Sequence, residues 1–136
     1  MEVKSNAERV LWNYRTNVFK ASEYREMLSN MESVRGQDYG GHAVNGVSDP
    51  VPEVVNRKLK LEKKLSGMEK EIRAVDNLMD SLDEKELDMH QMLGILNRRY
   101  ILHKETDTII RELGITKATY YRRKNALIEL AEIYMS

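Results

Sequence analysis

The stretch LGITKATYYRRK, residues 113–124, places two tyrosines and three consecutive basic residues behind a Leu-Gly-Ile-Thr turn. Arginine pairs bidentately with guanine, and basic side chains also neutralise phosphates, so this composition is typical of a helix that reads duplex DNA. Residues 97–125 carry a clear excess of Lys and Arg over Asp and Glu, although the net charge of the chain is zero. The alternative is a basic helix that is only well solvated. The neighbouring residues decide between the two.

The residues before and within this stretch predict a helix-turn-helix. DTIIREL, residues 107–113, indicates a two-turn helix, and Gly114 stands where a left-handed residue would end it. Thr116 can cap a following helix that starts at about Lys117. A short helix, a glycine turn and a second helix form this motif. Its predicted core consists of Ile109, Ile110, Leu113, Gly114, Ile115, Tyr120 and Leu127.

The two tyrosines are predicted to have different roles. At about 100° per residue, Leu127, Ala131 and Tyr134 fall on the side of Tyr120 and face the core. The opposite side, with Tyr121 toward one edge, forms the surface of a recognition helix. The candidates for base contacts are Lys117, Ala118, Tyr121, Arg122 and Asn125. The candidates for phosphate contacts are Arg98, Arg99, Lys104, Thr116, Arg123 and Lys124.

Another predicted helix precedes the motif. Asp83 and Glu86 have capping-box spacing, and an apolar stripe follows. The stripe consists of Met89, Leu93, Leu96 and Tyr100. The DNA-binding module is therefore expected to span residues 83–136.

The N-terminal part predicts two amphipathic helices separated by a loop. Ser5 and Glu8 indicate a capping box and a helix that runs to about Met31, within a segment 1–32. Glycines and both prolines gather in 33–52, which predicts a flexible loop.

Residues 53–82 carry a heptad seam and predict a long helix for oligomerisation. The seam can pack against the N-terminal helix as a hairpin, against a second subunit, or against both in a four-helix arrangement. A dimer is expected. The residues assigned to oligomerisation are Leu61, Leu65, Met68, Ile72, Val75, Met79 and Leu82.

Composition favours an all-α protein and excludes thiolate chemistry. Leu, Met, Glu and Lys are abundant, and there is no cysteine, hence no disulfide and no thiolate metal site. The three histidines are isolated from one another and lack metal-ligand spacing, so no metal, cofactor or catalytic activity is expected. No signal peptide and no membrane span is predicted, which suits a cytoplasmic protein.

The stretch from Leu93 to Tyr100, LGIT at 113–116 and TYYRRK at 119–124 together resemble a known motif. They are similar to the C-terminal helix-turn-helix of phage-encoded transcriptional regulators of the ArpU and RinA type, and through it to region 4 of sigma factors. This resemblance implies an activator of phage late genes that binds promoter DNA in the cytoplasm of a bacterial host. Two alternatives stay open: a packaging protein similar to a small terminase subunit, and a sigma-like factor that docks on RNA polymerase.

Overall fold

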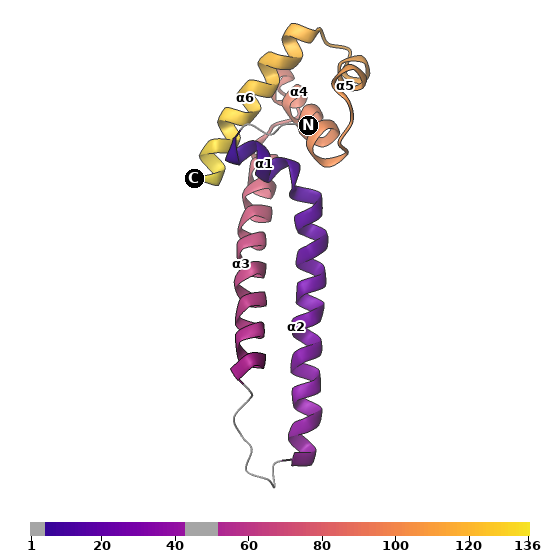
Figure 1. The fold of residues 1–136 in the computed structure, drawn as a ribbon. Helices are drawn as coiled ribbons and strands as arrows, with labels where there is room; N and C mark the ends of the chain where they lie inside the picture. Colours follow the sequence, from indigo (N-terminus) through magenta and orange to yellow (C-terminus); the bar gives the residue numbers. More distant parts are fainter. Residues whose placement is uncertain (1–4, 43–51) are drawn as a thin grey trace. The chain divides into compact units, whose positions relative to one another are not determined.

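The computed structural model describes residues 5–42 and 52–136, with side chains for residues 5–31 and 52–136. Every regular element in these ranges is a helix, which confirms the all-α prediction (Figure 1). The elements are α1 (Asn6–Trp12), α2 (Tyr14–His42), α3 (Pro52–Ser81), α4 (Leu87–Ile95), the π-helix η2 (Leu96–Ile101), α5 (Thr106–Leu113) and α6 (Lys117–Met135). None of the described helices is long and apolar enough to cross a membrane.

The described chain forms two compact units. The larger unit comprises Met1–Asn17 and Lys70–Ser136, and the hairpin unit comprises Val18–Glu69. In the larger unit α6 packs against α4 and α1, and α1 also contacts η2. The compact body around the helix-turn-helix is therefore larger than the predicted module 83–136, because α1 and the end of α3 complete its core.

A single apolar core holds the larger unit together. Its members come from every helix of the unit and are almost completely shielded from water. Burial of a large apolar side chain contributes about 1.5–3 kcal/mol, so these residues dominate the stability of the unit. The fully buried large side chains are Tyr100, Tyr120, Leu11, Leu78, Ile95, Leu96, Ile109, Leu127, Val10 and Val75.

The hairpin unit contains the parts of α2 and α3 that fall within Val18–Glu69, and these lie side by side (Figure 1). Arg25 and Glu69 form an ion pair across it at 3.8 Å, and Ala21 is fully buried. The predicted seam residues Leu61 and Leu65 are half-buried here. Of the arrangements predicted for the seam, the structure therefore contains the one in which the N-terminal helix folds back along it.

The C-terminal end of the heptad seam has a different environment. Val75 and Leu82 are buried in the core of the larger unit, and Met79 packs against that core. The oligomerisation role predicted for Val75 and Leu82 does not fit this burial, because neither side chain is available to a second subunit.

The predicted first helix is interrupted and also longer than expected. Asn13, with φ −91° and ψ 3°, separates α1 from α2, and α2 continues to His42 instead of ending near Met31. The predicted loop at 33–52 is thus helical up to His42, and its remaining part, 43–51, lies outside the described residues.

The two predicted capping boxes have different outcomes. The Ser5 hydroxyl accepts a hydrogen bond from the Glu8 N–H at 3.1 Å, as predicted, and the Glu8 carboxylate accepts one from the Tyr100 hydroxyl. The second box is wrong: Glu86 itself precedes α4 without a side-chain cap, and Asp83 accepts from the Lys85 N–H at 2.9 Å. Asp83 thus closes a local turn, a bond for which short polar side chains compete well.

Candidate nucleic-acid interface

The turn between α5 and α6 has the predicted local geometry. Gly114 ends α5 with φ 64° and ψ 36°, a left-handed conformation that costs glycine little. The Thr116 hydroxyl accepts from the Thr119 N–H at 3.1 Å and so caps α6, which begins at Lys117. These observations confirm the predicted C-terminal glycine, the N-cap and the helix start.

The predicted motif core is buried or packed against buried residues. Ile109, Tyr120 and Leu127 have no exposed surface. The partly buried members that pack on the core are Ile110, Leu113 and Ile115. The orientation of α6 about its axis is therefore fixed by apolar contacts, with Tyr120 inward.

The predicted reading face of α6 is exposed. Tyr121 is 41% exposed, and its ring lies edge-on to that of Tyr120 with centroids 5.0 Å apart. Arg122 is exposed, with one guanidinium nitrogen 3.5 Å from the Thr119 hydroxyl. The remaining exposed candidates on this face are Lys117, Ala118 and Asn125. All five side chains are thus accessible to a ligand.

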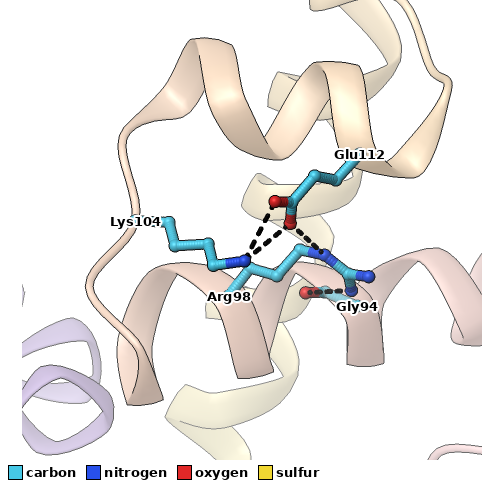
Figure 2. A network of polar contacts seen from close by, with 4 residues as sticks. All are labelled: Gly94, Arg98, Lys104 and Glu112. Carbon is cyan, nitrogen blue, oxygen red and sulfur yellow. Dashed lines mark hydrogen bonds and ion pairs between the residues drawn. The ribbon is translucent and has the colours of Figure 1, made fainter.

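Two of the predicted phosphate contacts converge on one carboxylate. The Lys104 ammonium donates to both oxygens of Glu112 at 2.8 and 3.0 Å, and the Arg98 Nε donates to Oε1 at 3.1 Å (Figure 2). The hydrogen bond from Lys104, assisted by Arg98, lowers the pKa of Glu112. The carboxylate is therefore ionised at neutral pH.

Arg99 lies in the core rather than on the surface. It is 6% exposed, and its Nη1 donates to the Tyr120 hydroxyl at 3.1 Å. Its guanidinium carbon also lies 5.5 Å from the centroid of the Tyr100 ring. The predicted phosphate contact does not fit this burial, because a phosphate cannot approach the guanidinium. Arg99 instead holds the buried Tyr120 side chain in place by a hydrogen bond to its hydroxyl group.

The last three phosphate candidates also have partners within the chain. Arg123 pairs with Asp88 at 2.6 Å and donates to the Gln91 side chain at 2.9 Å. Lys124 lies 3.6 Å from the Glu8 carboxylate and is 17% exposed. Thr116 uses its hydroxyl in the cap. The charged ends of Arg123 and Lys124, which were predicted to contact phosphates, connect α6 to α4 and α1 in the structure.

A buried polar link between α1 and η2 was not foreseen. The Tyr100 hydroxyl donates to Glu8 Oε2 at 2.5 Å, between residues far apart in the sequence. Burial, followed by this hydrogen bond, raises the pKa of Tyr100 above its ordinary value. Because Lys124 approaches the same oxygen, Glu8 links the N-terminal helix to the proposed recognition helix.

Two further residues near the motif escaped the sequence interpretation. Arg111 is exposed on α5 and forms no ion pair within the described residues. Arg111 lies roughly 160° around the helix from buried Ile109, and this spacing could have predicted that Arg111 is exposed. Gly94 lies where α4 meets α5, since a Cβ there would stand 2.7 Å from a methyl group of Leu113.

The described part of the chain has no cluster of three or more His, Asp or Glu side chains suited to a metal ion. His103 stacks on Trp12, with ring centroids 3.7 Å apart and an interplanar angle of 3°. Its Nε2 also lies 3.0 Å from the Trp12 carbonyl oxygen. His103 thus attaches α1 to the segment between η2 and α5, and the side chain of His42 lies outside the described residues.

Fold and surface together define an all-α protein whose C-terminal helix-turn-helix presents an exposed basic face. Residues 27–131 match a family described as a protein of unknown function, DUF1492. Because this match covers most of the chain, the protein belongs to that family. Neither a curated protein nor a solved structure matches the chain.

Proposed function

We propose that this protein is a sequence-specific regulator of transcription that binds duplex DNA. In this proposal the N-terminal half of α6 enters the major groove, and Tyr121, Arg122 and Asn125 face the base edges. The observation that carries the proposal is the rigid placement of α6: Tyr120 is buried and backed by Arg99, while the outward face is polar, basic and exposed.

The likeness to the ArpU and RinA type supports a narrower role, namely activation of phage late genes at promoter DNA. In this role RNA polymerase is a second partner in the bacterial cytoplasm. Basic residues outside the groove then set register and salt dependence. Lys117 and Arg111 suit this best, because both are exposed and neither forms an ion pair within the described residues.

Dimerisation through the hairpin unit belongs to the same proposal. Phe19, Met27 and Leu59 are 65%, 49% and 56% exposed in this unit. A second copy that covers them would place two recognition helices on one DNA molecule, as two-fold operators require. The mass of the protein in solution tests this part directly.

The decisive experiment is selection of binding sites from random duplex DNA at two salt concentrations. We expect enrichment of a defined motif whose binding weakens as salt rises. Arg122→Ala should then weaken binding to the selected site by about 1–3 kcal/mol while changing binding to random DNA little. Arg73→Ala is the matched control, because Arg73 is exposed on α3, outside the motif.

No enrichment with the wild-type protein would overturn sequence reading. An equal loss on selected and random DNA would reassign Arg122 to a phosphate. A ring-shaped assembly larger than a dimer, without affinity for promoter-like duplexes, would favour a packaging role.

A further inference from the structure

Arg98 and Lys104 are two cations from different segments that share one acceptor. Arg98 lies in η2, Lys104 precedes α5, and Glu112 lies in the last turn of α5. Figure 2 shows both nitrogen groups pointing at the Glu112 carboxylate, and the Arg98 Nη1 lies 3.5 Å from the Gly94 carbonyl oxygen. The two cations are thus held together before any ligand arrives.

The shared carboxylate is accessible and exchangeable. The side chains of Arg98, Lys104 and Glu112 are 32%, 36% and 35% exposed. Ion pairs of this exposure are weak, because water screens them and solute anions compete. Arginine and lysine donate to the oxygens of carboxylates and phosphates alike, so the two nitrogen groups that bind Glu112 also suit a phosphate.

The position of the site in the motif is suitable for the DNA backbone. Glu112 lies two residues before the Gly114 turn, which leads directly to the exposed start of α6. Arg111, its neighbour in the chain, is exposed as well. A duplex held by the start of α6 thus has phosphates available to the short helix α5.

We propose that Arg98 and Lys104 form a binding site for a backbone phosphate of duplex DNA, which the Glu112 carboxylate occupies in the free protein. This inference rests on the proposed function. Only a DNA site that makes enough other contacts displaces the carboxylate, so binding at this site must overcome an internal competitor. The carboxylate thereby lowers affinity for random DNA, where few other contacts contribute to binding.

The test is Glu112→Gln, which retains the shape of the side chain and removes the competing charge. Binding of the full-length protein to a fluorescently labelled duplex of mixed sequence is measured over a series of salt concentrations. Glu105→Gln is the matched control, because Glu105 is exposed, lies in the same region and makes no side-chain cap to α5. Circular dichroism and thermal melting verify that the variants are folded.

We expect Glu112→Gln to bind roughly two- to fivefold more tightly than wild type, the range set by loss of a competing exposed ion pair. The slope of log affinity against log salt should steepen by about 0.9, the value for one additional phosphate contact. Glu105→Gln should stay close to wild type. In the Glu112→Gln background, Arg98→Gln with Lys104→Gln should abolish both gains.

Unchanged or weaker binding by folded Glu112→Gln, with an unchanged slope, would overturn the inference and leave the proposed function standing. No DNA binding by wild type or Glu112→Gln would overturn the proposed function and the inference together. If Glu112→Gln does not fold, the double change Arg98→Gln and Lys104→Gln in wild type decides, measured on the selected DNA site, where the carboxylate is displaced. A slope shallower by about 0.9 supports the site, and an unchanged slope refutes it.

Discussion

The larger unit and the hairpin unit are both helical, but they are held together by different means. The larger unit encloses a shared apolar core and a buried polar link through Glu8 and Tyr100. In the hairpin unit Ala21 is the fully buried apolar residue among those described, and apolar side chains such as Phe19 stay exposed. Helical content is therefore a poor guide to stability. Stability depends on how completely the apolar side chains of a helix are buried by neighbouring helices.

Replacing one leucine by alanine in each unit should give the largest difference in lost unfolding free energy between the two units. Leu127→Ala removes a fully buried side chain and should cost about 2–5 kcal/mol of unfolding free energy. Leu65→Ala, half-buried in the hairpin unit, should cost roughly 1 kcal/mol. Urea denaturation measures both. A large loss at Leu65 that grows with protein concentration would break the contrast and reveal a second copy on the hairpin unit.

A smaller difference in unfolding free energy is expected when the hydroxyl group of one tyrosine in each unit is removed. Tyr100→Phe removes the donor to the Glu8 carboxylate and should cost about 1–3 kcal/mol, because a buried acceptor loses a partner. Tyr24→Phe in the hairpin unit should change stability by less than about 0.5 kcal/mol. The same denaturation series compares them, and equal losses would show that the Tyr100 link contributes nothing specific.

Two glycines should respond to alanine with opposite signs. Gly114→Ala forces a side chain into a left-handed conformation and should cost about 1–2 kcal/mol. Gly67→Ala, within α3 and with no atom near its added Cβ, should stabilise the helix by about 0.5–1 kcal/mol. Thermal melting of both variants is sufficient. A stabilising Gly114→Ala would mean that the turn does not hold this conformation in solution.

Alkaline pH should act on the larger unit through Tyr14. Burial, followed by its hydrogen bond to Asp76, raises the pKa of Tyr14 from 10.0 to about 12. The folded protein therefore holds this proton more tightly than the unfolded chain, and the resulting stability is complete below pH 10 and falls between pH 10 and about 12. Tyr14→Phe should flatten that fall in unfolding free energy. Identical pH profiles of wild type and Tyr14→Phe would refute the Tyr14 contribution.

The parts of the candidate interface that follow local rules were predictable from the residues. Gly114, the Thr116 cap and the inward and outward tyrosines each depend on a few neighbours and on helix periodicity. The end of the first helix was less predictable: residues 33–42 carry loop-forming glycines, yet α2 includes them. Helix propensity is a weak guide, and context overrides it.

The sequence by itself determined the all-α class, the glycine turn, the start of α6 and the side of α6 that faces water, because these depend on backbone sterics and on a period of 3.6 residues. Only the tertiary structure decided what each charged side chain does. Glu8 accepts a hydrogen bond from Tyr100 and pairs with Lys124. Arg99 donates to the Tyr120 hydroxyl, and Glu112 binds the side chains of Arg98 and Lys104. These partners are distant along the chain, and the apolar core brings them together without leaving any periodic trace in the sequence.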